Sequence, residues 1–375
     1  MSWKIPLFKM YWDDEDVTQV SAAIRIGMNW ALGPQIPVFE QKIAEYIGTK
    51  YCLTFNSGTS ALHAALLSYG IGAGDEVIVP SFTFIATANT PKFVGATPVF
   101  ADIEDDTFGL DPADVEAKIT PRTKAIIPVH YGGYPCRIRE LRSLAEEHDL
   151  ILIEDAAEAM GAKEGGKTVG TFGDSAILSF CQNKIITTGE GGAVVTDNRD
   201  LYEKMKLVRS HGRPDTLDYF STTEVLDYLS LGYNFRISTM TAALGLAQLE
   251  KIGRLIGIRR SDAAYYREGL KDVRGVTVPP EQPDSFAVYQ LFSIRAEKRD
   301  ALMKHLEGKG IMTKIYFPPV HKTHYYQNVL GYSPCLPVTD TVSGDIVSLP
   351  FYPGITRDEM DTVILAIRKF GAKSR

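Results

Sequence analysis

Residues 150–196 have the sequence LILIEDAAEAMGAKEGGKTVGTFGDSAILSFCQNKIITTGEGGAVVT, in which three short apolar runs are separated by turns and glycine-rich loops. The runs are Leu150–Asp155, Ser175–Phe180 and Gly192–Thr196. Short runs that are apolar at successive positions are typical of strands buried in a mostly parallel sheet with helices on its faces. The sequence here therefore predicts an α/β fold.

The same alternation extends toward the N-terminus. We predict four more strands, Tyr51–Phe55, Glu76–Pro80, Pro98–Ile103 and Lys124–His130. The helices expected around them have apolar residues three and four apart and are Asp13–Ile26, Val38–Ile47, Thr59–Leu67, Arg137–His148 and Leu201–Arg209. The pattern of strand, helix and strand favours crossover connections within one sheet.

The pattern changes after residue 234. A long helical stretch, Ser238–Leu270, has Ser238 as its expected N-cap and a possible break near Gly253. Beyond it we predict strands at Ala287–Ile294 and Thr313–Phe317 and helices at Arg299–Leu306 and Arg357–Lys369. We therefore expect a large domain, residues 1–250, and a smaller α/β domain, residues 251–375.

Composition excludes several classes of protein. The 40 basic and 46 acidic residues leave a formal net charge of −6, which does not favour a nucleic-acid binder. Four scattered cysteines form no CxxC pair, so reduced thiols and no metal site are expected. The start of the chain lacks a signal-like apolar core, and no stretch predicts a membrane span. We expect a cytoplasmic protein.

Three local motifs could carry chemistry. Ser57, Gly58 and Thr59 follow a predicted strand and open a predicted helix, where free N–H groups and the helix dipole bind phosphate; plain helix capping is the alternative. Asp155 ends a buried strand, where α/β sheets bind ligands, although strand-end acids often only form turns. Lys184 lies 29 residues later (184 minus 155), just before a glycine turn. A partly desolvated lysine there could form a Schiff base with an aldehyde cofactor.

Together with these motifs, five ordered segments resemble one family. The segments are NSGTSAL, PSFTFIATAN, IEDAAEAMG, SFCQNKIITTGEGG and GYNFRISTMTAALGLAQL. They are similar to the DegT/DnrJ/EryC1/StrS sugar aminotransferases, which use pyridoxal 5′-phosphate (PLP) and have the fold type I, aspartate aminotransferase-like architecture. The resemblance implies a large domain with a mostly parallel mixed sheet and a smaller C-terminal α/β domain.

The resemblance also implies roles for individual residues. Lys184 would hold the cofactor covalently and move a proton, and Asp155 would pair with the protonated pyridine nitrogen. Gly58, Thr59 and Ser179 would bind the cofactor phosphate, and Phe84 would stack on its ring, although core packing is the alternative for Phe84. In this family Asn234 would reach the phosphate of the other subunit, which implies a homodimer with shared active sites.

Glu158 departs from the family pattern. Many members have Gln here, whose amide can donate to the cofactor's phenolic oxygen, whereas an ionised Glu can only accept. Either Glu158 holds a proton or it contacts a neighbouring donor. Perosamine synthases look similar at this position, so Glu158 points toward that subgroup.

The expected substrates are a nucleotide-linked keto sugar and, as the family's usual donor, L-glutamate, which becomes 2-oxoglutarate. We predict amination at C4 of a 4-keto-6-deoxy sugar, as in a GDP-perosamine synthase. The alternatives are a 3-keto dTDP- or UDP-sugar and a non-catalytic regulatory relative. A dehydratase of similar sequence would have histidine in place of Lys184. The resemblance places His321 near the sugar, and His211 and Arg213 could contact the sugar or a phosphate.

Overall fold

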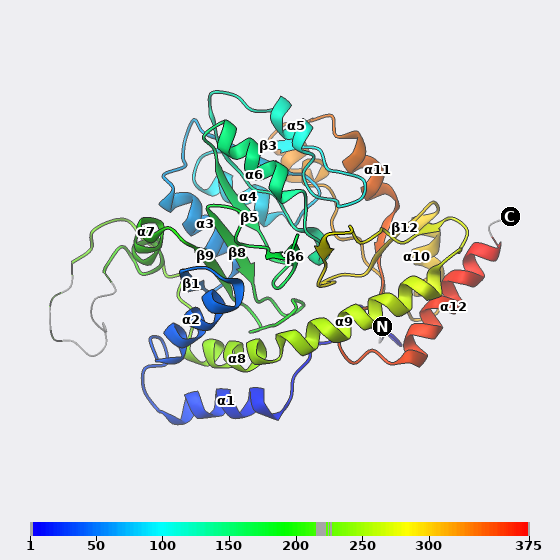
Figure 1. The fold of residues 1–375 in the computed structure, drawn as a ribbon, viewed down its shortest axis with the longest axis horizontal. Helices are drawn as coiled ribbons and strands as arrows, with labels where there is room; N and C mark the ends of the chain where they lie inside the picture. The colour runs from blue at the N-terminus through cyan, green and yellow to red at the C-terminus, as the bar shows by residue number, and fades with distance from the viewer. Residues whose placement is uncertain (1–2, 215–222, 224, 226, 374–375) are drawn as a thin grey trace.

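The computed structural model describes residues 3–214, 223, 225 and 227–373. At its centre is a seven-stranded sheet with the strand order β1-β9-β8-β5-β4-β2-β3 (Figure 1). The strands are β1 (Tyr51–Phe55), β2 (Glu76–Pro80), β3 (Thr97–Ala101), β4 (Thr123–Ile126), β5 (Ile151–Asp155), β8 (Ser175–Ser179) and β9 (Gly192–Thr196). Only the pairs that β9 makes with β1 and β8 are antiparallel within this sheet. The predicted mostly parallel sheet is confirmed.

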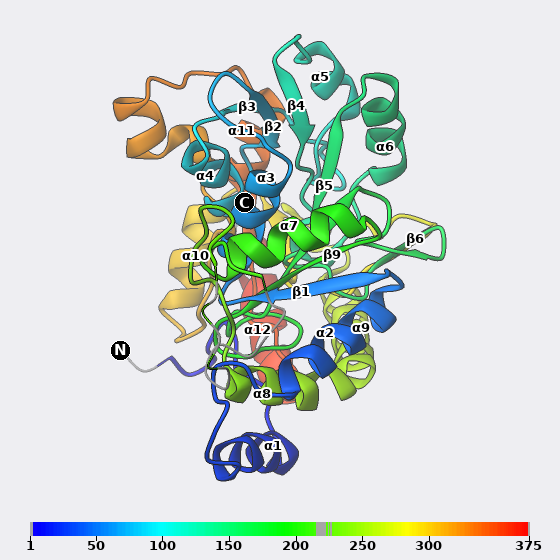
Figure 2. The same ribbon diagram turned by 90° about the vertical axis from the view of Figure 1, so that its left-hand side faces the viewer.

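Helices cover both faces of this sheet, because each central strand sends alternate side chains into two cores. In β8, Ala176 and Leu178 pack with α2, α8 and α9, whereas Ile177 packs with α3 and α7. Figure 2 shows α7 on one side of β1 and α2 and α8 on the other. The helices of this part are α1 (Asp14–Arg25), α2 (Gln35–Ile47), α3 (Gly58–Ser68), α4 (Ala86–Phe93), α5 (Pro112–Ala117), α6 (Ile138–Glu147) and α7 (Arg199–Arg209).

Two consecutive helices, α8 (Thr239–Glu250) and α9 (Ile252–Leu270), connect the large sheet to the C-terminal part of the chain (Figure 1). The predicted cap is confirmed, since Ser238 Oγ accepts the N–H of Thr241 at 3.2 Å. The helices meet at Lys251, two residues before the predicted break at Gly253. The Lys251 ammonium lies 2.8 Å from the Asp16 carboxylate, which ties α1 to this junction.

The C-terminal part has its own apolar core, built on a three-stranded sheet with the order β10-β12-β13. Its elements are β10 (Val276–Thr277), β12 (Ser293–Ala296), α10 (Arg299–Glu307), α11 (Pro337–Asp345), β13 (Ile346–Ser348) and α12 (Arg357–Lys373). A second small sheet, β11-β6-β7, joins β11 (Ser285–Phe286) to the hairpin of β6 (Lys163–Glu164) and β7 (Lys167–Thr168). None of the helices within the described residues is long and apolar enough to span a bilayer.

The prediction of a strand at Ala287–Ile294 is wrong, because most of this segment bonds to a glycine turn instead of a strand. The N–H groups of Val288 and Leu291 donate to the carbonyls of residues 133 and 132, at 3.0 and 3.2 Å. Tyr289 between them has a left-handed φ of 51°, which no strand residue adopts. Only the end of the predicted run belongs to a strand, β12.

Two other predicted strands differ from the structure. Thr313–Phe317 is not a strand, since its ladder is limited to an isolated bridge in which Lys314 exchanges backbone hydrogen bonds of 3.3 and 2.8 Å with Ser348. The run Lys124–His130 ends as a strand at Ile126. Pro128 follows closely and has no N–H group to continue the ladder.

Glu154, the neighbour of Asp155 in β5, belongs to a buried polar network. Its carboxylate accepts three backbone N–H groups from residues 170–173, each at 2.7 Å, and lies 3.1 Å from His130 Nε2. Burial opposes a charge on His130, but Cys136 and Glu154 outweigh it and raise the pKa of the ring. Since successive strand residues point to opposite faces, Glu154 supports the fold while Asp155 is free for the site.

Replacing Glu154 tests this structural role. Glu154→Ala leaves His130 and three backbone N–H groups unpaired in the interior, so we expect the free energy of unfolding to fall by about 3–5 kcal/mol. Glu146→Ala, which removes an exposed partner of Arg142, should cost less than about 1 kcal/mol. Urea denaturation followed by circular dichroism measures both, and equal effects of the two variants would contradict the assignment.

Candidate active site

The carboxyl ends of β5 and β8 lie side by side and carry the predicted catalytic residues. Asp155, the last residue of β5, pairs with Ile177 of the parallel strand β8. β8 ends at Ser179, and Lys184 follows in a turn in which its N–H donates to Cys181 O at 3.0 Å. Strand topology thus brings together residues that are far apart in sequence, at the edge where α/β sheets bind ligands.

The Lys184 ammonium contacts a buried carboxylate. Its Nζ lies 3.3 Å from Glu158 Oε1, and the two side chains are 14% and 6% exposed. The other oxygen of Glu158 accepts the N–H of Gly132 at 2.9 Å. Of the two possibilities left open by the sequence, the structure therefore shows Glu158 in contact with neighbouring donors, one of which is the lysine itself.

Asp155 is also buried. Its carboxylate accepts the Thr87 hydroxyl at 2.8 Å and the Ala157 N–H at 3.2 Å. Burial raises the pKa of Asp155, while hydrogen bonds from Thr87 and Ala157 and the charge of Lys184 oppose this increase. A cationic partner such as a protonated pyridine would compensate the buried charge, so the residue suits the role predicted for it.

The start of α3 forms the predicted phosphate cradle. Ser57 caps the helix by accepting the Ser60 N–H at 3.0 Å, and helix geometry leaves the N–H groups of Gly58 and Thr59 without intrahelical partners. A Cβ atom on Gly58 would lie 3.2 Å from Ser179 Cβ, and one on Gly192 would lie 2.5 Å from Gly58 N. Glycine at both positions lets the cradle approach the end of β8, as phosphate binding there requires.

Two other predicted cofactor contacts have exposed positions. The Phe84 ring is 56% exposed, and its centroid lies 5.7 Å from that of Phe317. Asn234 is exposed, and its carbonyl accepts Asn56 Nδ2 at 3.4 Å, one residue before the cradle. An open aromatic face and an amide beside the phosphate loop agree with their predicted roles, which stay predictions.

The predicted substrate residues separate into two places. His321 is buried, with Nδ1 2.7 Å from Ser81 Oγ and Nε2 3.5 Å from Asp340, and burial lowers its pKa. Both ring nitrogens thus have protein partners. His211 is exposed with a left-handed φ of 62°, and Arg213 is buried nearby at the end of the same turn, which is bridged to Asn234 through Ser210. The structure does not bring His321 together with this pair.

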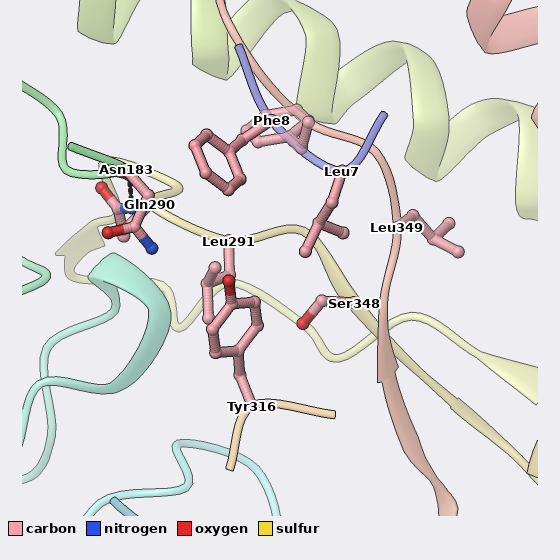
Figure 3. Close-up of a pocket in the computed structure, with 9 residues that line it drawn as sticks. Leu7, Phe8, Asn183, Gln290, Leu291, Tyr316, Ser348 and Leu349 are labelled. Atoms are coloured by element: carbon pink, nitrogen blue, oxygen red, sulfur yellow. Dashed lines mark hydrogen bonds between the residues drawn. The ribbon is translucent and has the colours of Figure 1, made fainter. Parts of the chain in front are cut away.

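Sequence reasoning missed several residues at the site. Thr87 lies within the SFTFIATAN segment and bonds to Asp155, but only its aromatic neighbour was singled out. Asn183, next to Lys184, lines a pocket with Tyr316 and Gln290 from the C-terminal part (Figure 3). These two come from segments predicted as strands, so nothing in their local pattern marked them as active-site residues.

A sheet covered by helices on both faces, with a lysine, two carboxylates and a glycine-lined helix start at its strand ends, defines the class of fold type I aminotransferases. The chain belongs to the DegT/DnrJ/EryC1/StrS aminotransferase family, whose model matches residues 11–368.

Curated relatives and solved structures agree with this membership. The chain is 40% identical to a GDP-perosamine synthase of Caulobacter vibrioides over 90% of each chain. It is 37% identical to a dTDP-3-amino-3,4,6-trideoxy-alpha-D-glucose transaminase of Streptomyces venezuelae, over 92% of this chain and 89% of the relative. The crystal structure of S. venezuelae DesV superposes with a TM-score of 0.92 at 35% identity and covers 100% of both chains.

The burial of Asp155 predicts a pH-dependent cost in the cofactor-free protein. Because its pKa is raised in the folded state, the acid destabilises the fold as pH rises through that pKa and it ionises, and has no such effect in acid. We expect cofactor-free Asp155→Asn to melt above wild type at pH 8 and to lose this advantage at pH 4. A melting-temperature difference that is the same at both pH values would contradict this account.

Proposed function

We propose that this protein is a PLP-dependent aminotransferase that transfers the amino group of L-glutamate to a nucleotide-linked keto sugar. The observation that carries the proposal is the contact of Lys184 with Glu158 beside buried Asp155. Bound PLP supplies an electron sink that stabilises negative charge on the carbon from which a proton is removed.

The residues of the chain supply the remaining functions. Lys184 would bind the cofactor aldehyde through its amine and, once released, would carry the proton to and from the reacting carbon. Asp155 would keep the pyridine nitrogen protonated, and the N–H groups of Gly58 and Thr59 with Ser179 would hold the phosphate. Glu158 orients the Lys184 amine through the 3.3 Å contact.

We further propose a 4-keto-6-deoxy sugar as the acceptor, as in a GDP-perosamine synthase. The supporting observations are Glu158 and the similarity to the Caulobacter relative of that name. The Streptomyces relative, whose printed name describes a 3-amino sugar, supports a second candidate in which the acceptor is a 3-keto sugar on dTDP. A non-catalytic role is disfavoured, because burying Lys184, Glu158 and Asp155 costs stability that a regulatory protein would have no need to spend.

We also propose a cytoplasmic homodimer with shared sites. Large apolar side chains are exposed around the N-terminal helix and the cradle, and exposed apolar clusters mark contact surfaces. They are Trp12 (65%), Met28 (62%), Trp30 (48%), Phe84 (56%), Phe93 (53%) and Leu231 (83%). A second copy on this surface would cover Phe84 and bring a partner residue toward the phosphate.

Lys184→Ala tests the catalytic assignment. Wild-type protein reconstituted with PLP should be yellow and should aminate a keto sugar from a panel of GDP-, dTDP- and UDP-linked 4-keto and 3-keto sugars with glutamate. Lys184→Ala should lose the visible absorbance band and at least about 10³-fold in turnover, since no other group replaces the amine. Lys206→Ala, which changes a surface lysine paired with Glu203, is the control. A colourless wild type would contradict the proposal, and turnover of 3-keto sugars alone would favour the second candidate.

Mixing two inactive variants tests the shared site. If Asn234 acts on the partner's cofactor, Lys184→Ala and Asn234→Ala subunits form a mixed dimer with one intact site. The refolded mixture should then recover up to about a quarter of wild-type activity, from statistical pairing in a twofold dimer. No recovery, with Asn234→Ala inactive alone, would place Asn234 in its own subunit's site.

A further inference from the structure

A pocket lies between the N-terminal segment, the loop before Lys184 and the C-terminal part (Figure 3). Nine side chains line it, and every one is uncharged: Leu7, Phe8, Asn183, Gln290, Leu291, Tyr316, Ser348, Leu349 and Phe351. Phe8 and Asn183 also line a neighbouring hollow that reaches Lys184. The pocket is therefore an extension of the lysine site with apolar walls and a few polar groups.

Tyr316 is the central polar residue of this pocket, and its hydroxyl points into it in Figure 3. Burial raises the pKa of Tyr316, the charge of Glu158 adds to this, and a hydrogen bond from Asn183 opposes it. The hydroxyl therefore lies within the field of the carboxylate that contacts Lys184. The Lys314 ammonium stacks on the Tyr316 ring, 4.9 Å from its centroid, and does not line the pocket.

The polar wall of the pocket is held in place by bonds that no bound ligand is needed to form. Tyr131 donates its hydroxyl to the Tyr316 carbonyl, and Gln290 Nε2 donates to the Asn183 carbonyl. Buried Arg259 donates to the carbonyls of Tyr289 and Gln290 at 3.1 and 3.4 Å. These bonds stabilise the left-handed turn at Tyr289 and preorganise the wall.

We propose that this pocket is the subsite for the uncharged ring of the sugar acceptor, with Tyr316 and Asn183 binding a ring hydroxyl and Leu7, Phe8 and Leu291 contacting apolar ring atoms. A carboxylate or a phosphate would need a cationic partner, which no lining residue provides. A hydroxyl both donates and accepts, so it can satisfy a phenol and an amide together. Glutamate and the nucleotide phosphates must therefore bind elsewhere in the site.

This inference rests on the proposed function and adds a specificity determinant to it. Sites that hydrogen-bond a substrate hydroxyl reject analogues that lack it, because the buried polar groups are then left unpaired. The apolar wall equally favours a methyl group over a hydroxymethyl group at the neighbouring ring carbon, since the latter would bury an unpaired hydroxyl. Tyr316 and Asn183 thus select among keto sugars and play no part in the choice of amino donor.

Tyr316→Phe tests the subsite, because it removes one hydroxyl and keeps the ring. Stopped-flow absorbance of the cofactor follows the two half-reactions separately, first with glutamate and then with the nucleotide-linked keto sugar that wild type converts best. We expect kcat/KM for the sugar half-reaction to fall about tenfold and the glutamate half-reaction to change by less than about twofold. Tyr266→Phe is the matched control, since it removes a buried hydroxyl that donates to Pro350 O at 3.0 Å in the C-terminal core.

A second arm uses substrates that each lack one ring hydroxyl. Wild type should discriminate against one of these deoxy sugars, and Tyr316→Phe should lose that discrimination. Equal losses in both half-reactions, no loss, or a loss confined to glutamate would overturn the subsite. If Tyr316→Phe does not fold, wild-type indifference to every deoxy sugar would overturn it. A wild type that aminates keto acids and no keto sugar would instead overturn the proposed function, and the subsite with it.

Discussion

Three ionisable side chains, Asp155, Glu158 and Lys184, meet in the interior at the carboxyl edge of the seven-stranded sheet, and the cost of burying them governs the surrounding structure. Each requires partners, since an unpaired buried charge is strongly unfavourable. The partners come from α4, from the turn at residues 131–133 and from the lysine itself. The site is therefore a stability cost that ligand binding can recover.

The same edge depends on backbone proximity. Gly58 and Gly192 lie so close to neighbouring chain that a Cβ on Gly192 would come within 2.5 Å of another residue's backbone. This contact places the start of α3 beside the end of β8. On the opposite side, the turn that Arg259 holds at Tyr289 binds both the loop before the lysine and the glycine turn that supports Glu158. The C-terminal part thus helps to position the lysine as well as to close the pocket.

The sequence predicted the parts of this arrangement that have local patterns. Continuous apolar runs identified β1, β2, β5, β8 and β9, and the motif order identified Lys184 and Asp155. The segment 287–292 has the composition of a strand, yet its hydrogen bonds go to a distant glycine turn that no local pattern reveals. Tyr316, Gln290 and Thr87 were missed for the same reason, because their roles arise from contacts across long sequence separations. The partition of Glu154 and Asp155 into structural and site residues follows from strand alternation.

The central claim is that Lys184 is the residue that binds the cofactor. Borohydride reduction of the PLP-reconstituted protein, followed by proteolysis and mass spectrometry, tests it most directly, because reduction makes the lysine–cofactor bond permanent. The account predicts a single modified peptide with the cofactor on Lys184. Modification of another lysine with Lys184 unmodified, or no modified peptide from a protein that retains its yellow colour, would contradict it.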